Sequence, residues 1–305
     1  CKMNQTVINF IRDKFNTDEF IPLHTPTFLG NEKKYLIDCI DSTYVSSVGA
    51  YVYEFESVMS KITNTEKSIA VVNGTAALQV ALRLVGVKKD DEVLTQALTF
   101  VATANAISYN NAYPVFLDVD IDTMGLSPES VNDFLEEYGD LREDGCYNKK
   151  SGRKIAACMP MHTFGFPVHI NKLIEVCKKW NIPIVEDAAE SLGSEYNGIS
   201  TGGFGEVAAF SFNGNKIVTS GGGGAIITNN IELGDKAKFL TTTAKTPHPY
   251  EYFHEELGYN FRMPNLNAAL ACAQLEQLDV FLKNKRELAL DYSSFFKKEG
   301  INFRT

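Results

Sequence analysis

Lys216 is the residue of this chain best placed to act as a nucleophile. It lies in the small, polar segment FSFNGNKIVTSGGGG (210–224), and the apolar runs 207–210 and 225–228 at either end are typical of strands. A lysine amine becomes a nucleophile only when burial or a neighbouring cation lowers its pKa. Most lysines lie on surface turns, so a catalytic role depends on what else the sequence places nearby.

An aspartate one strand–helix–strand unit earlier supplies a partner for this lysine. Residues 182–185 read as a buried parallel strand, and Asp187 follows its carboxyl end, the edge where ligands bind in open α/β sheets. Pyridoxal phosphate (PLP) needs a lysine for its Schiff base and a carboxylate that keeps its pyridine nitrogen protonated, so that the ring acts as an electron sink. Asp187 and Lys216 therefore predict a PLP site.

A predicted helix start could hold the phosphate group. Residues 68–72 are typical of a strand, and the alanines and leucines from Ala76 onward favour a helix. Gly74 and Thr75 then lie at the helix N-terminus, where free N–H groups and the helix dipole attract anions. Thr75 could equally be the N-cap, and both roles can hold together. The hydroxyl of Ser211 could bind the same phosphate, or belong to an ordinary strand serine.

Four motifs follow one another along the chain: NGTAAL (73–78), TFVATAN (99–105), VEDAA (185–189) and FSFNGNK (210–216). In this order they resemble the DegT/DnrJ/StrS family of PLP-dependent nucleotide-sugar aminotransferases, which are fold-type-I enzymes. The resemblance runs from about residue 21 to about residue 275. It implies an α/β fold with a mostly parallel central sheet, helices on both faces, and PLP as the cofactor.

The resemblance also implies roles for single residues. Lys216 would form the Schiff base and shuttle the proton, and Asp187 would contact the pyridine nitrogen. Phe100 would stack on the cofactor ring, although a core phenylalanine is the alternative. Glu190 stands where Gln or His often reaches the phenolic oxygen of the cofactor, which an ionised glutamate would repel. The phosphate would be held by Gly74, Thr75, Ala76 and Ser211.

Two further positions concern the partner subunit and the substrate. The segment GYNFRMPNLNAA (258–269) resembles the family segment that crosses into the neighbouring subunit, so Asn260 would contact the partner's cofactor phosphate in a homodimer with shared active sites. A polar loop before a helix is the alternative. His162 follows the predicted strand 155–160 on the ligand edge and could line the substrate pocket. A loop histidine with satisfied hydrogen bonds is the alternative there.

Composition favours a cytoplasmic globular enzyme. The 305 residues are 44% hydrophobic and 22% charged, and the net charge of −9 argues against nucleic acids and anionic membranes as general partners. An anionic nucleotide sugar would then need a local basic patch. No apolar run is long enough for a membrane helix. Six scattered cysteines, beginning with Cys1, and five dispersed histidines predict reduced thiols and no metal site.

Strands alternate with helices through the middle of the chain, as expected for an α/β sheet. The predicted strands are 68–72, 92–95, 113–117, 155–159, 182–186, 207–212 and 224–228. The predicted helices are 30–43, 51–65, 76–85, 101–108, 127–137, 171–180 and 265–283, the last continuing toward 298. The charged segment 138–153 is predicted to be a surface excursion.

Two domains are expected. Residues 1–250 would form the large PLP-binding domain, and 251–305 the helical start of a small C-terminal α/β domain, with a strand beginning at Ile301. The chain is therefore expected to be truncated. The glycines 221–224 precede a strand and not a helix, so they are no dinucleotide fingerprint; they would let the backbone pass close to the cofactor.

The predicted activity is amino transfer from an amino acid, glutamate by resemblance, to the 4-keto group of a nucleotide-linked deoxysugar. The residues around Lys216 most resemble members that aminate UDP-linked 2-acetamido-2,6-dideoxy-4-ketohexoses for bacterial surface glycans. Two alternatives share the scaffold. Sugar 3-dehydratases carry histidine at the lysine position, so Lys216 argues against them. A non-catalytic PLP-binding regulatory module would bind the cofactor without transferring an amino group.

Overall fold

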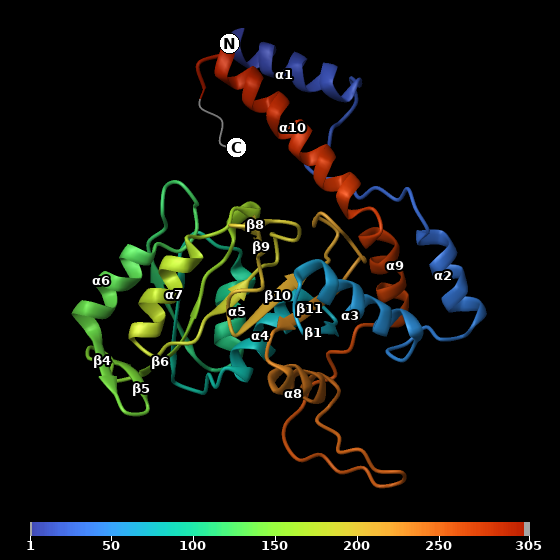
Figure 1. The fold of residues 1–305 in the computed structure, drawn as a ribbon. Helices are drawn as coiled ribbons and strands as arrows, with labels where there is room; N and C mark the ends of the chain where they lie inside the picture. The colour runs from blue at the N-terminus through green and yellow to red at the C-terminus, as the bar shows by residue number, and fades with distance from the viewer. Residues whose placement is uncertain (1, 302–305) are drawn as a thin grey trace.

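Two groups of strands form the centre of the computed structural model, which describes residues 2–301 (Figure 1). The first group has the order β1 (Lys67–Val71), β11 (Gly224–Thr228), β10 (Val207–Ser211) and β7 (Val185–Asp187). The second has the order β3 (Tyr113–Leu117), β2 (Glu92–Gln96), β6 (Lys154–Met159), β5 (Gly145–Asn148) and β4 (Gly139–Arg142). Parallel bridges from Cys158 to Ile184 and from Met161 to Asp187 connect the two groups.

The predicted α/β fold is confirmed, and one strand departs from the parallel pattern. β2 runs parallel to β3 and β6, and β7 runs parallel to β10. β11 runs antiparallel to both β1 and β10. The connection from β10 to β11, residues 212–223, contains no helix. Parallel neighbours require a long crossover, so a short loop at one sheet edge makes the next strand run backward.

Helices cover both faces of the sheet because successive strand residues point to opposite sides. In β1, Ile69 and Val71 pack in one cluster and Ala70 in another. The first cluster includes α4 (Gly74–Leu84), α5 (Val101–Tyr109) and α8 (Ile231–Thr241). The second includes α3 (Ala50–Thr63) and α9 (Asn265–Leu275), and α2 (Glu32–Asp41) packs beside α9. A third cluster holds α6 (Pro128–Tyr138) and α7 (Ile170–Lys179).

Several elements differ from the prediction. The predicted excursion 138–153 is the antiparallel hairpin β4–β5. The helix predicted from residue 265 is broken at 276–277, and α10 (Leu278–Lys298) follows. The unpredicted elements are α1 (Lys2–Phe15), α8, the 3₁₀ turn η1 (Thr163–Gly165), β8 (Glu195–Tyr196) and β9 (Ile199–Ser200). No helix of residues 2–301 is both long and apolar enough to cross a membrane.

Helices α1 and α10 form a pair that projects from the sheet (Figure 1). Phe10 and Phe295 stack in this pair, with ring centroids 3.9 Å apart. We call the pair the α1–α10 arm. Cys1 and most of the strand predicted from Ile301 lie outside the described residues. The predicted division of the chain at residue 250 stays a prediction; α9, beyond it, shares a core with α3.

Candidate active site

A cavity of about 280 Å³ lies where β1, β7 and β10 end. Three segments that are distant in the sequence meet there: the start of α4, the end of β7 and the loop after β10. The predicted residues that line the cavity are Gly74, Thr75, Phe100, Asp187, Glu190, Ser211 and Lys216. The ligand edge expected from parallel strand ends is therefore present.

The loop after β10 presents Lys216 to this cavity. The amide of Lys216 donates to the carbonyl of Asn213 (3.0 Å), and that of Ser220 donates to the carbonyl of Phe212 (2.9 Å), which folds the loop back on itself. The Lys216 side chain is 14% exposed, and its Nζ lies 3.4 Å from Oε1 of Glu190. The amine is thus partly buried, with the carboxylate of Glu190 beside it.

Asp187 lies at the floor of the cavity and is 2% exposed. Its Oδ2 accepts a hydrogen bond from the hydroxyl of Thr103 (2.7 Å), and its Oδ1 accepts one from the amide of Ala189 (3.2 Å). Burial raises the pKa of the Asp187 carboxyl above its ordinary value of 3.8, against the lowering effects of these two bonds and of Lys216. A cationic ring nitrogen at this carboxylate would relieve the cost of burying its charge.

The start of α4 has the features of an anion site, with one correction. The N-cap is Asn73 and not Thr75, and its Oδ1 accepts from the amide of Ala76 (2.8 Å). The amides of Gly74 and Thr75 precede the first intrahelical bond and stay available for an anion. Ala76 does not line the cavity. Its amide is used by the cap, which argues against the predicted phosphate contact.

Two glycines allow close packing at this end of the cavity. A Cβ on Gly74 would lie 2.8 Å from Cβ of Ser211, and a Cβ on Gly224 would lie 2.5 Å from the backbone carbon of Asn73. The start of α4, the end of β10 and the start of β11 therefore touch backbone to backbone. This contact keeps the predicted phosphate-binding residues beside the lysine loop.

Phe100 and Glu190 form the outer wall. Phe100 is 64% exposed and lines the cavity, so it is not the core phenylalanine that was the alternative. Glu190 makes two contacts, one with Lys216 and one through Oε2, which accepts from the amide of Phe164 (2.9 Å). Phe164 has a left-handed backbone (φ 52°), and the carboxylate holds that turn in place.

His162 is not part of the cavity wall. It is fully buried; its Nδ1 accepts from the amide of Val168 (3.2 Å), so Nε2 carries the hydrogen that bonds Oε2 of Glu186 (3.0 Å). Glu186 also accepts from the amides of Gly202, Phe204 and Gly205. The structure thus corrects the substrate contact predicted for His162 in favour of its alternative, a histidine with satisfied hydrogen bonds.

Asn260 also lies outside the cavity of its own chain. It is exposed, and its Oδ1 accepts from Nε of Arg262 (2.9 Å). It follows a long excursion, residues 245–258, that extends below α8 (Figure 1). The predicted contact of Asn260 with a partner's cofactor stays a prediction.

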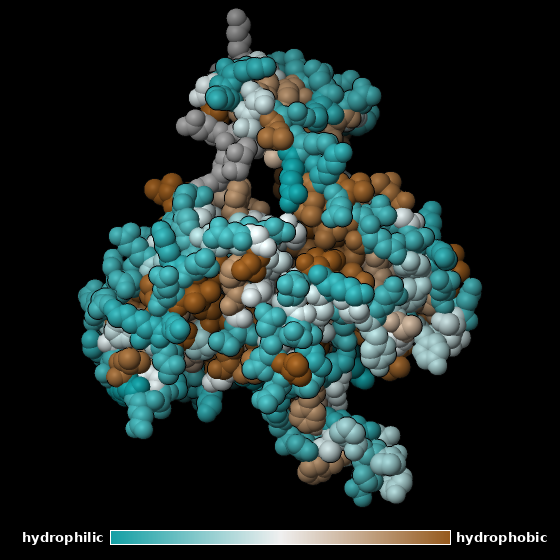
Figure 2. Space-filling view, viewed as in Figure 1, coloured by the Kyte–Doolittle hydropathy of each residue, from teal (hydrophilic) through white to brown (hydrophobic). Residues whose placement is uncertain are grey.

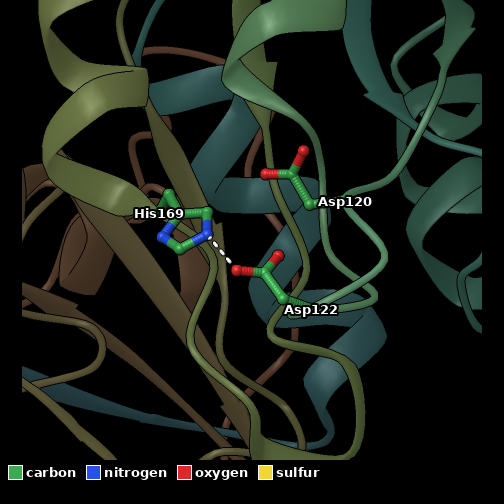
Figure 3. A group of neighbouring side chains, drawn as sticks. All are labelled: Asp120, Asp122 and His169. Atoms are coloured by element: carbon green, nitrogen blue, oxygen red, sulfur yellow. Dashed lines mark hydrogen bonds and ion pairs between the residues drawn. The ribbon is translucent and has the colours of Figure 1, made fainter.

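One histidine lies beside two carboxylates, although the sequence predicted that the histidines are too dispersed for a metal site. His169 Nε2 is 2.7 Å from Oδ2 of Asp122, and Asp120 lies beside them, with ligand atoms of all three within 4.8 Å of one another (Figure 3). The hydrogen bond with His169 lowers the pKa of Asp122.

The five described cysteines are free and buried; Cys1 lies outside the described residues.

The residues of the cavity fit PLP. A buried carboxylate, a partly buried amine and two available helix amides line one cavity. These are the groups required for the pyridine nitrogen, the aldehyde carbon and the phosphate. The sequence did not predict the roles of Thr103 and Asn73, although they lie in the motifs 99–105 and 73–78. Their roles depend on contacts that the motifs do not reveal.

Comparisons with known proteins agree with this geometry. The profile of the DegT/DnrJ/EryC1/StrS aminotransferase family matches residues 28–304. GDP-perosamine synthase of Escherichia coli O157:H7 is 37% identical over 284 residues, which cover 93% of this chain and 72% of the relative. EpsN of Bacillus subtilis, whose name describes it as a pyridoxal phosphate-dependent aminotransferase, is also 37% identical, with coverage of 93% and 70%. The solved aminotransferase PseC of Helicobacter pylori has the same fold, with a TM-score of 0.82, 24% identity and coverage of 92% and 71%.

Proposed function

The chain belongs to the DegT/DnrJ/EryC1/StrS aminotransferase family, and from this premise we propose that it uses PLP to transfer an amino group from L-glutamate to the keto group of a nucleotide-linked deoxysugar. The observation that carries the proposal is the convergence of Lys216, Asp187 and the start of α4 on one cavity. PLP supplies an electron sink at the carbon that gains or loses a proton.

The residues of the cavity have distinct proposed tasks. Asp187 holds the ring nitrogen in its protonated form, while Gly74, Thr75 and Ser211 bind the phosphate. Phe100 packs against the ring. Lys216 would hold the cofactor. Once released, its amine would act as a general acid–base that moves the proton between a carbon of the cofactor and the carbon of the substrate that bears the nitrogen. Its contact with Glu190 supports this role because the carboxylate keeps the amine at the cavity wall when it is not bonded to the cofactor.

The sugar is the less specific part of the proposal. The sequence predicted a UDP-linked 2-acetamido-2,6-dideoxy-4-ketohexose. Two relatives of this chain, from Escherichia coli O157:H7 and Vibrio cholerae, are named GDP-perosamine synthase. These names favour a GDP-linked acceptor over the predicted UDP-linked one. We propose a nucleotide-linked keto sugar as the class, and a comparison of GDP- and UDP-linked acceptors decides between the two.

We further propose a homodimer in which Asn260 serves the partner's cofactor site. The excursion 245–258 supports a protein partner: Tyr250 and Tyr252 are each 81% exposed, and Leu257 is 75% exposed. The proposal assigns these exposed side chains to the interface between the two subunits. In this proposal Asn260, which lies outside the cavity of its own chain, reaches the cofactor site of the partner.

The proposal is tested by absorbance spectroscopy of the protein with PLP, before and after addition of L-glutamate. We expect a band of lysine-bound cofactor that converts to a pyridoxamine band. Lys216→Ala should give neither the lysine-bound band nor the conversion. Lys172→Ala, an exposed position on α7, is the matched control and should behave as wild type. A wild-type protein that never forms the lysine-bound band would overturn the proposal; stable binding with no conversion by any amino acid would favour the non-catalytic module.

A further inference from the structure

A second, larger cavity adjoins the lysine site. Its volume is about 730 Å³, and it shares Glu190 and Asn215 with the first cavity. The Phe164 turn stands on one side, and α10 forms the opposite wall through Leu282 and Leu290. Hydrophobic side chains gather on the body below the α1–α10 arm, where the surface is hollowed (Figure 2). The chain therefore has room for a substrate several times larger than the amino donor.

Two cations on α10 line this second cavity. Lys285 and Arg286 are both exposed. Lys285 also shares a small cavity of about 90 Å³ with Lys216, so it lies within one compartment of the reactive amine. Within residues 2–301 neither cation has an ion-pair partner, whereas Lys283, on the same helix, pairs with Glu287 (3.9 Å). Among the described residues, the guanidinium of Arg286 has one long bond, 3.4 Å, to the carbonyl of Gly193.

The other ionisable groups of this wall leave it cationic. Glu190 is occupied by Lys216 and by the amide of Phe164. His24 lines the same cavity, and its pKa is lowered by burial and then by the charge of Lys285. In a chain with a net charge of −9, two unpaired cations beside an apolar cavity form a local anion-binding surface.

We propose that Lys285 and Arg286 bind the diphosphate group of a nucleoside-diphosphate-linked acceptor, with the sugar directed past Phe164 toward Lys216. This inference rests on the proposed function. A diphosphate matches the pair because two adjacent anionic groups can engage the guanidinium fork and the neighbouring ammonium at once. The apolar side chains Leu282 and Leu290 then face the uncharged parts of the acceptor.

The test measures binding of GDP and of UDP, without a sugar, to the PLP-loaded protein by isothermal titration calorimetry. Of GDP and UDP, the one that the wild type binds more tightly should bind the double variant Lys285→Gln/Arg286→Gln about 10- to 100-fold more weakly, as expected for the loss of charge-assisted contacts. Binding of the unphosphorylated nucleoside should not change. Lys283→Gln is the matched control, because it removes one charge from the same helix outside the cavity; it should bind as wild type.

A separate readout distinguishes this inference from the proposed function. The spectral conversion by L-glutamate needs no nucleotide, so the double variant should retain it. Retained conversion with unchanged diphosphate affinity would overturn the α10 site and leave the aminotransferase proposal intact. Absence of diphosphate binding in the wild type would overturn it too. An equal loss of affinity in Lys283→Gln would overturn it as well. So would a loss of spectral conversion in the double variant that matches its loss of diphosphate affinity. The variant Lys285→Arg/Arg286→Lys, which keeps both charges, should recover most of the affinity.

Discussion

Asp187→Asn should separate cofactor binding from folding. The wild-type carboxylate is 2% exposed and has two neutral donors, Thr103 and the amide of Ala189. Burial raises its pKa, so the protonated form is favoured by folding. The stability that this group contributes is therefore full below its ordinary pKa of 3.8 and is lost as the pH rises through the raised value. Near neutral pH the cofactor-free variant should be as stable as wild type or more stable.

The cofactor-bound protein should behave in the opposite way. A charge-assisted hydrogen bond to the ring nitrogen contributes about 1.5–3 kcal/mol, and each 1.4 kcal/mol is about tenfold in affinity. The variant should bind PLP about 10- to 100-fold more weakly. Because ligand binding stabilises the folded state by linkage, and about 1 kcal/mol shifts the Tm of a chain of roughly this size by about 2 °C, the PLP-induced rise in Tm should shrink by about 3–6 °C.

The assay is thermal unfolding of wild type and variant with and without saturating PLP. Asp133→Asn, an exposed carboxylate on α6, is the control and should keep the full rise in Tm. Lowering the pH toward 4 should reduce the difference between the two cofactor-free proteins, since wild-type Asp187 becomes protonated. An undiminished PLP-induced rise in the variant would refute the assignment of Asp187 to the ring nitrogen.

Two further perturbations test the surroundings of the site. Glu186→Gln should cost about 2–4 kcal/mol of unfolding free energy in urea titrations, because the buried carboxylate accepts from His162 and three amides. Burial acts to raise its pKa, but these bonds lower it below the ordinary value of 4.5. The difference in unfolding free energy should therefore stay constant above about pH 4.5 and shrink as the pH falls through the lowered pKa. A difference that grows as the pH falls would contradict this. When Lys216→Ala and Asn260→Ala chains are co-expressed, about half of the dimers should be mixed. If residues are shared across the interface, one of the two sites in each mixed dimer has both wild-type residues, so about a quarter of all sites should be active. A dimeric mixture with no activity would argue that Asn260 acts within its own chain.

The strands and most helices were predictable because their signals are local. Residues 113–117 and 224–228 are strands with the predicted bounds. The start of α8, which the sequence analysis does not predict, has a capping signal: Asn230 accepts from the amide of Leu233, with Glu232 in the first turn. The helix α1 carries apolar residues at helical spacing, and its packing partner is α10, far away in the sequence.

The site was predictable where residue type alone determines the chemistry. Lysine, aspartate and a glycine-containing helix start are residue types suited to the aldehyde, ring nitrogen and phosphate of PLP, and all three line one cavity. The positions of His162 and Thr103 were not predictable in this way. Both lie near strand or helix ends on the ligand edge, but one side chain turns to Glu186 and the other to Asp187. Such choices depend on contacts between segments that no local pattern records.

The reversed strand β11 follows from the short connection that carries Lys216. A crossover helix after β10 would carry the chain to the opposite edge of the sheet before the next strand began. The loop 212–223 instead stays at the edge where β10 ends, so β11 must start there and run backward. Gly224 begins it, paired with the last residues of β10 and β1, Ser211 and Val71. No side chain fits at this position against Asn73. The short loop and the antiparallel β11 thus bring the lysine loop and the start of α4, the proposed phosphate site, to the same edge of the sheet.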